Sequence, residues 1–186
     1  MEKYKIYNSN LIQNNHQDYI SQCNLLNNEL KIILNNQSPT IKYSKYNIFN
    51  FSSTSLLFYQ LFKELNFHIR SYIGDDRPLW LQAWLNFHSK ESLQKELKEH
   101  SHESEYHGYI CINPHDTSTC FKKGFEIKNY PGLIYLGPGS NGNTTNDYNH
   151  YVKINSDFTS PRITIGLDIA LTPNNAICLP SWIPLI

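Results

Sequence analysis

The sequence lacks an excess of charge of either sign. Its 186 residues contain 16 Lys and Arg against 16 Asp and Glu, so the formal net charge at pH 7 is zero. Proteins that hold nucleic acid through its phosphates usually present a strong positive field. Nucleic acid is therefore not indicated as an obligatory partner, and a small-molecule substrate is the expected ligand.

Long apolar runs are also missing. No segment approaches the ~20 consecutive apolar residues that a membrane-spanning helix needs. The charged start MEKYKIYNSN is not followed by the apolar stretch of a signal peptide. We therefore expect a protein that has no membrane partner and resides in the cytoplasm.

Cysteine is scarce and widely spaced. The sequence has no CxxC pair, the spacing that is typical of zinc modules and redox sites. Reduced core thiols in a cytosolic protein are the expectation, and a contact between Cys111 and Cys120 across a hairpin is the alternative. The cysteines are Cys23, Cys111, Cys120 and Cys178.

Two helices are predicted in the first third of the chain. From Asp18 to Asn36 apolar residues recur at steps of three and four, which is the spacing of one helix face. A second helix begins at the Ser/Thr cluster at 52–55, a natural cap, and runs through Leu56, Leu57, Leu61, Phe62 and Leu65. The intervening Ser38–Asn50 segment predicts a loop or a short edge strand.

After residue 67 the apolar period changes from about 3.6 to 2, which predicts a series of short strands. Turn signals such as GDDRP, YPG and GPGSNGN separate them. The predicted strands are His68–Ile73, Leu79–His88, His107–Asn113, Cys120–Ile127, Gly132–Leu136, His150–Ile154 and Arg162–Leu171. This pattern predicts an α+β, mainly β, single domain with a sandwich or barrel and helices packed outside. Its regions are a helical segment (1–66), a β-barrel core (67–171) and a C-terminal tail (172–186).

Histidines gather in the segment Glu99–Tyr109. His100 and His102 are two apart, so on a strand both imidazoles face the same side and can reach one ion. His107 opens the next apolar strand, where it is a third ligand, a donor to a ligand, or a strand cap. Neutral imidazole binds iron, zinc, copper and nickel, so the segment predicts a transition-metal site. The alternative is an exposed loop in which these histidines are incidental.

Two further residues extend this set. His150 begins another predicted strand, and Arg162 begins the strand after it. A guanidinium can hold the far end of a carboxylate ligand whose near end chelates a metal. A surface histidine and a surface ion pair are the alternative readings.

The strand Leu79–His88 has two distinct faces. Trp80, Gln82, Trp84, Asn86 and His88 share one face, and the apolar residues between them share the other. We predict that the apolar face packs against the helices and that the Trp and amide face lines the barrel. Buried amides need partners, so Gln82, Trp84 and Asn86 predict a substrate pocket. An inverted strand with the Trp residues in the core is the alternative.

These motifs resemble those of the double-stranded β-helix superfamily, which comprises the cupins and the Fe(II)/2-oxoglutarate-dependent oxygenases. The resemblance covers roughly residues 79–168 and rests on HxHxxxxHGY, GLIYLGPG, the later His150 and RITIGLD. These runs are also similar to short oxygenase-like proteins encoded by tailed phages. The superfamily implies a jelly-roll (cupin) barrel. The oxygenases have a carboxylate ligand at the position of His102. In this sequence, either Glu103 or Glu105 would supply a carboxylate ligand, or the site has none.

The resemblance implies a non-haem Fe(II)/2-oxoglutarate-dependent dioxygenase that hydroxylates a small substrate. His100, His102 and His150 would bind Fe(II), with His107 as a further ligand. Arg162 and Tyr135 would bind the 2-oxoglutarate cosubstrate, and Tyr109 would join Gln82, Trp84 and Asn86 at the substrate.

Two other functions stay open. One is a four-histidine cupin enzyme that uses another divalent transition metal alone, without 2-oxoglutarate. The other is a non-enzymatic ligand-binding or structural β-domain, such as one from a virion. A homodimer and a phage-encoded protein in the host cytoplasm are compatible with all three functions.

Overall fold

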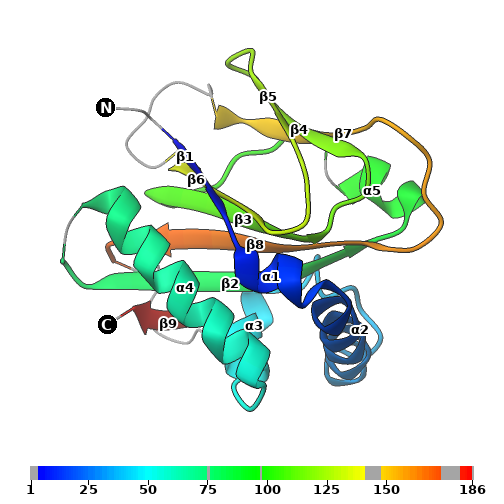
Figure 1. Cartoon of the computed structure of the whole chain (residues 1–186), viewed down its shortest axis with the longest axis horizontal. Coiled ribbons are helices and arrows are strands. Elements are labelled where there is room, and N and C mark those ends of the chain that lie inside the picture. Colours follow the sequence, from blue (N-terminus) through cyan, green and yellow to red (C-terminus); the bar gives the residue numbers. More distant parts are fainter. Residues whose placement is uncertain (1–3, 75, 97, 141–147, 173–180, 186) are drawn as a thin grey trace.

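The computed structural model describes residues 4–74, 76–96, 98–140, 148–172 and 181–185, and it contains two antiparallel sheets with most of the helices on the outer face of the large sheet (Figure 1). The large sheet has the strand order β1-β6-β3-β8-β2-β9, and the small sheet has the order β5-β4-β7. The strands are β1 (Lys5–Asn8), β2 (Leu79–His88), β3 (Tyr106–Asn113), β4 (Thr117–Phe121), β5 (Glu126–Lys128), β6 (Leu133–Pro138), β7 (His150–Ile154), β8 (Arg162–Ala170) and β9 (Trp182–Leu185). The helices are α1 (Asn10–Asn14), α2 (His16–Ile33), η1 (Tyr43–Lys45), α3 (Ile48–Phe51), α4 (Leu56–Ile73) and α5 (Lys90–Glu96).

The order in which the chain visits the two sheets defines a jelly roll. The inner strands of the large sheet are β6-β3-β8-β2, and the chain crosses to the small sheet for β4, β5 and β7. A backbone bridge between His100 and His150 adds a fourth segment beside β7. Two facing antiparallel sheets built from such crossings form the double-sheet jelly roll of the cupins. The predicted fold class, a mainly β double-stranded β-helix with helices outside, is confirmed.

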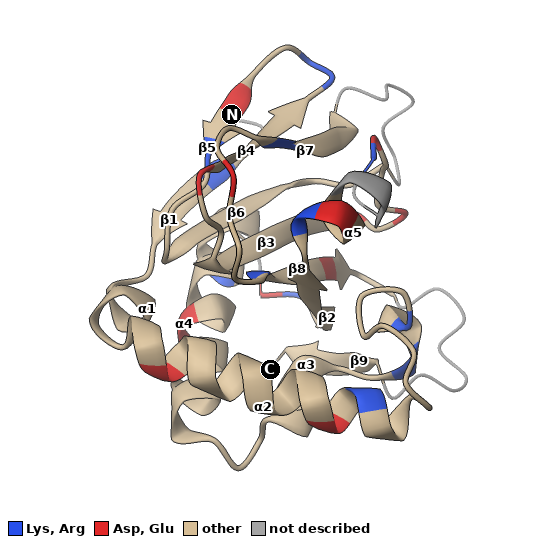
Figure 2. Cartoon of the chain, turned by 90° about the vertical axis from the view of Figure 1, so that its right-hand side faces the viewer, with Lys and Arg blue, Asp and Glu red and all other residues tan. Residues whose placement is uncertain are grey.

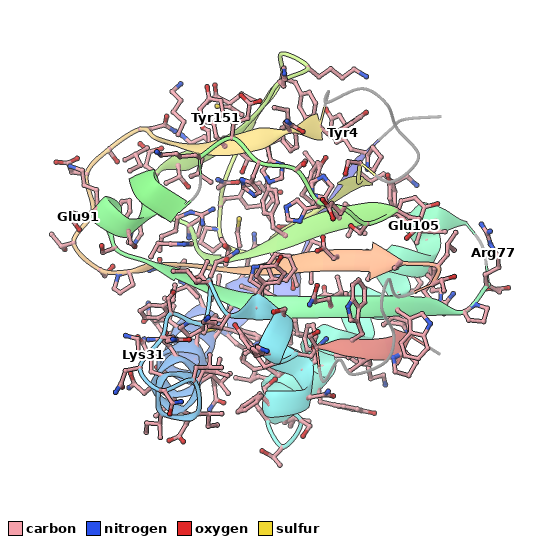
Figure 3. The ribbon with its side chains drawn as sticks, turned by 180° about the vertical axis from the view of Figure 1, so that it is seen from behind. Tyr4, Lys31, Arg77, Glu91, Glu105 and Tyr151 are labelled. Atoms are coloured by element: carbon pink, nitrogen blue, oxygen red, sulfur yellow. The ribbon has the colours of Figure 1, made fainter. Side chains whose placement is uncertain are left out.

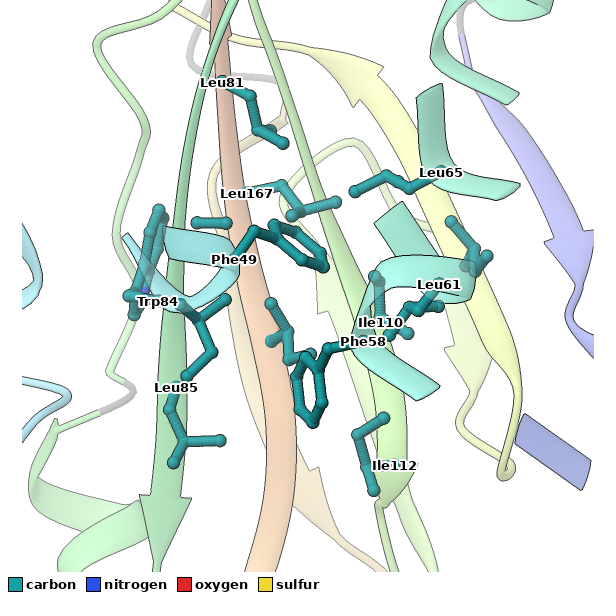
Figure 4. Packing of buried hydrophobic residues seen from close by; sticks show 14 of the residues in the cluster. Phe49, Phe58, Leu61, Leu65, Leu81, Trp84, Leu85, Ile110, Ile112 and Leu167 are labelled. Carbon is teal, nitrogen blue, oxygen red and sulfur yellow. The ribbon is translucent and has the colours of Figure 1, made fainter. Parts of the chain in front are cut away.

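The main core lies between the helices and the outer face of the large sheet (Figure 4). Helix α4 buries Phe58, Leu61, Leu65 and Ile69, whose spacing of three and four places them on one side. They meet the odd-numbered residues of β2 and β8, such as Leu81 and Leu167. The predicted orientation of Leu79–His88 is thus observed, and the inverted alternative is wrong.

The predicted strand His68–Ile73 is wrong, because α4 continues to Ile73. Ile69 is fully buried and extends the helical spacing of Leu61 and Leu65, so packing against the sheet favours another turn of helix. The helix ends at Gly74, whose φ of 72° is the left-handed conformation that suits glycine at a helix end.

Other predicted elements need smaller corrections. Cys120–Ile127 is not one strand but the end of β4, a turn and the start of β5, with Gly124 at φ 93° in the turn. The segment 38–50 contains η1 and the start of α3 rather than a strand. Within 172–186, β9 pairs with β2 as an edge strand. Cys23, Cys111 and Cys120 are free buried thiols, and Cys178 lies outside the described residues.

Charged residues of both signs are interspersed over the surface (Figure 2). Lys31 on α2, Glu91 on α5 and Arg77 in the connection from α4 to β2 are exposed and project outward (Figure 3). In the described part of the chain, no helix has both the length and the apolar character that crossing a bilayer requires.

Candidate metal centre and its cavity

A cavity of about 730 Å³ lies between the two sheets. Its floor is the inner face of the large sheet, where the even-numbered residues of β2 and β8 point away from the helices. On β8 these residues are Arg162, Thr164, Gly166 and Asp168. A volume of this size lies within the ~300–1,000 Å³ that is usual for small-molecule sites.

Three histidines converge at one end of this cavity. One nitrogen from each of His100, His102 and His150 lies within 4.8 Å of the others, as ligands of a single ion require. His100 and His150 are also joined through their backbones, since each donates its N–H to the carbonyl of the other, at 3.1 and 3.0 Å. The sheet, and not only the side chains, therefore sets the separation of these two residues.

The hydrogen bonds of these histidines fix which ring nitrogen is free. Nδ1 of His100 lies 2.7 Å from the carbonyl of Lys98, and Nδ1 of His150 lies 3.1 Å from the carbonyl of Tyr148. Because a carbonyl oxygen only accepts, both Nδ1 atoms carry the proton. The Nε2 atoms keep their lone pairs, which is the form that binds a metal.

In His102 a carboxylate, and not a backbone carbonyl, holds the proton on Nδ1 and leaves Nε2 free. Its Nδ1 lies 2.9 Å from Oδ1 of Asp168, which also accepts a hydrogen bond from the hydroxyl of Ser104 at 3.1 Å. A carboxylate that holds a ligating histidine in this way fixes its ring and raises its basicity. Sequence reasoning missed Asp168. Its signal was the alternation of β8, which places Asp168 on the same face as Arg162.

His107 lies beside this group but outside it. Its ring stacks on that of His102, with centroids 4.8 Å apart, and it is almost fully buried. Neither of its ring nitrogens has a hydrogen-bond partner in the described structure. It borders a void of about 10 Å³ shared with His102, about the volume that one water needs. A buried imidazole with two unpaired nitrogens fits a site that is completed by a bound group.

The turn after β6 holds the histidine segment in place. Ser140 donates through both its N–H and its hydroxyl to the carbonyl of His102, at 2.8 Å in each case. Gly139 donates its N–H to the carbonyl of Glu105, and a Cβ on Gly139 would lie 2.0 Å from the carbonyl oxygen of Ser104. The glycine is required by this close backbone approach. The GPGS motif thus positions the segment that carries His102.

Burial favours the uncharged form of three of these histidines, His100, His107 and His150. It lowers the pKa of His107 and of His150 well below the ordinary histidine value, and repulsion from His102 lowers both further. Burial also lowers the pKa of His100, again followed by the effect of His102. Neutral imidazole is the metal-binding form, so burial favours the form of His100 and His150 that can bind a cation.

Arg162 lies at the opposite end of the cavity from the histidines. It is 2% exposed, and its Nη1 donates to the hydroxyl of Thr164 at 3.2 Å, whereas its Nε has no hydrogen-bond partner. No carboxylate of the described residues pairs with it. Burial lowers its pKa, yet a guanidinium stays charged at neutral pH. A buried cation of this kind needs an anion to offset its desolvation.

The other predicted site residues divide into two groups. Gln82, Trp84, Asn86 and Tyr109 line the cavity. Tyr135 does not, because it is fully buried in a second core cluster behind the ring of His107. The carboxylate ligand that Glu103 or Glu105 would have supplied is absent from the described histidine group, and Glu105 instead accepts the N–H of Leu171.

No family model and no curated protein matches this chain. Among solved structures, the chain is similar to an acireductone dioxygenase from Bacillus anthracis with a cadmium ion in its active centre. The TM-score is 0.38 and the sequence identity is 17%. The match covers 61% of this chain and 61% of that dioxygenase. The strand order and the crossings between the two sheets define the fold.

Proposed function

We propose that this protein is a metal-dependent oxygenase that acts on a small molecule. His100, His102 and His150 would hold a divalent transition metal, and Arg162 would bind a carboxylate in the same cavity. One observation carries this proposal. Three imidazoles with free Nε2 atoms converge at one end of a cavity whose other end holds a buried guanidinium without an acidic partner. The donor set suits iron, since imidazole is a ligand for first-row transition metals.

The carboxylate that we propose first is that of 2-oxoglutarate, with Fe(II) as the metal. The guanidinium of Arg162 reaches along β8 to Thr164. From Thr164 to Asp168 the strand advances about 13 Å, at ~3.3 Å per residue. The metal, its histidines and a five-carbon dicarboxylate would occupy this interval. Bound iron with this cosubstrate would supply the activation of O2 for hydroxylation of the substrate.

The chain's own residues have separate tasks in this proposal. Asp168 fixes the ring of His102, and the backbone bridge sets His100 against His150. Arg162 orients the cosubstrate by its far carboxylate. The cavity wall at Gln82, Trp84 and Asn86 holds the substrate beside the metal and excludes water from the reacting end.

An anaerobic titration with Fe(II), with and without 2-oxoglutarate, tests this function. Chelation of the cosubstrate by iron produces a visible charge-transfer band, which we expect in the wild-type protein. The band should vanish in Arg162→Ala and in His150→Ala and persist in Arg77→Ala, an exposed arginine that serves as the matched control. Absence of the band from iron-loaded wild-type protein would contradict the use of 2-oxoglutarate.

One observation favours a second function, a metalloenzyme that does not use 2-oxoglutarate. The described ligand group consists of histidines alone, without the carboxylate that the oxygenases use. In that case Arg162 would bind the substrate itself. Metal binding without the band would support this function. Failure to bind any metal, together with tolerance of His100→Ala, would instead support a non-enzymatic β-domain.

A further inference from the structure

The wall of the cavity beside the histidines is aromatic. The indole of Trp84 lies over Gly166, its partner on β8, so closely that a Cβ there would be 2.4 Å from Cε2 of the indole. The ring of His102 stacks beside this indole with a centroid separation of 5.9 Å. Tyr43 also contacts the indole, with ring centroids 5.2 Å apart and a tilt of 44°. Trp84 is 7% exposed and lines the cavity, so it presents a small aromatic surface next to the proposed metal site.

Two amides flank this indole along β2. Asn86 accepts a hydrogen bond from Nε1 of Trp84 at 3.1 Å, which commits its carbonyl oxygen and leaves its NH2 group for another acceptor. Gln82 lies on the other side, is 4% exposed, and lines the cavity. Its amide has no hydrogen-bond partner among the described residues. A buried amide without a partner costs stability unless a ligand or water pairs with it.

We infer that this part of the cavity binds a planar lactam ring, in which a ring N–H adjoins a ring C=O. A primary amide such as that of Gln82 offers one acceptor and one donor side by side, which matches the edge of a lactam. The NH2 group of Asn86 supplies a further donor to a ring carbonyl. The indole of Trp84 favours an unsaturated, flat ring over a puckered one. This inference names the substrate class of the proposed oxygenase and, as a statement about the substrate, rests on that function.

Two matched probes test the inference without any turnover. We would titrate zinc-loaded protein with 2-pyridone, a planar lactam, and with 2-piperidone, its saturated counterpart with the same ring size and the same edge. Binding would be followed by saturation-transfer NMR of the probes. We expect 2-pyridone to bind at least about fivefold more tightly, the ratio that a modest aromatic stacking contribution produces.

Variants separate the two parts of the site. Trp84→Leu should bring the ratio of the two affinities close to one, whereas Gln82→Met should weaken both probes by about fivefold or more, because the lactam edge loses its partner. Trp80→Leu is the matched control, since Trp80 is on the same face of β2 but does not line the cavity. Circular dichroism and the thermal midpoint would establish that each variant folds, and Trp84→Met, which also lacks an aromatic ring, would replace Trp84→Leu if the latter does not.

Equal affinities in the wild-type protein, or an equal effect of Trp80→Leu and Trp84→Leu, would overturn the inference. Its failure is distinguishable from failure of the proposed function. A charge-transfer band without the 2-pyridone preference would support the proposed oxygenase function and contradict the lactam site. A preference for 2-pyridone without the charge-transfer band would support the lactam site and contradict the use of 2-oxoglutarate.

Discussion

Asp168 on β8 holds His102, which lies in the segment before β3, with its Oδ1 2.9 Å from Nδ1 of the imidazole. The two residues are distant in the sequence and belong to different elements, so the contact exists only in the folded barrel. It gives an all-histidine site a neighbouring negative charge. A divalent cation bound by neutral imidazoles would be stabilised by that charge.

Asp168→Asn should weaken Zn²⁺ binding by about tenfold, and Asp168→Ala should weaken it by up to about 100-fold, because the carboxylate both orients and polarises His102. Competition with a chromophoric chelator would measure the affinity. Asp157→Asn, which changes an exposed aspartate, serves as control and should have no effect. An unchanged affinity in Asp168→Ala would contradict this role.

The histidines should differ in their importance for metal binding. We expect His150→Ala to abolish stoichiometric binding, since it removes one of three converging nitrogens. His107→Ala should retain a weaker site, because its nitrogens lie outside that group. Metal content after dialysis would measure both, with His16→Ala as control, since His16 bonds the carbonyl of Ile112 far from the cavity. Equal losses in His107→Ala and His150→Ala would establish His107 as a full ligand.

Arg162→Met should make the metal-free protein more stable while it abolishes carboxylate binding. A buried guanidinium without an acidic partner is costly to desolvate, and methionine fills similar space without a charge. We expect a gain of about 1–3 kcal/mol in the free energy of unfolding, measured by urea denaturation. A loss of stability would mean that the charge has a stabilising partner in the folded protein.

The stability should depend on pH through His88. Burial, followed by the charge of Arg162, lowers the pKa of His88 from 6.5 to about 3. Between these values the unfolded chain binds a proton that the folded chain excludes, so stability falls as the pH falls through this window. For this residue alone the slope is about 1.4 kcal/mol per pH unit. Urea denaturation between pH 4 and 7 should show a shallower slope in His88→Gln, and an unchanged slope would refute the assignment.

Gly166→Ala should destabilise the fold by about 1–3 kcal/mol, because the new methyl group would overlap the indole of Trp84. In a Trp84→Leu background the same substitution should cost much less. A double-mutant cycle in thermal or urea denaturation measures the coupling. Additive effects would show that the glycine is needed for another reason.

The sequence predicted the elements whose patterns are local. The bounds of β2 and β7 match the predicted strands, and the alternation of β2 correctly assigned its two faces. The predicted strand His68–Ile73 was wrong, because these residues continue α4. Their local pattern alone did not reveal the sheet against which Ile69 packs. Short edge strands such as β1 and β9 carry too few residues for a period to be recognised.

The candidate site was predictable in its ligand types but not in its supporting contacts. His100, His102 and His150 followed from spacing and resemblance, and they do converge. The contact of Asp168 with His102 depends on the long-range register that sets β8 against β3, which no local pattern encodes. The same holds for Tyr43, which reaches the cavity from η1, a segment expected to be a loop or strand.

The reciprocal backbone hydrogen bonds of His100 and His150 have a consequence for how the site is filled. Two of the three proposed ligands are joined by an isolated backbone bridge beside β7, so the site should form when the chain folds, whether or not an ion is present. Loading would then require little reorganisation and would be limited by exchange of the ion's own water ligands. Removal of the ion by a chelator would be reversible, and the barrel would stay intact.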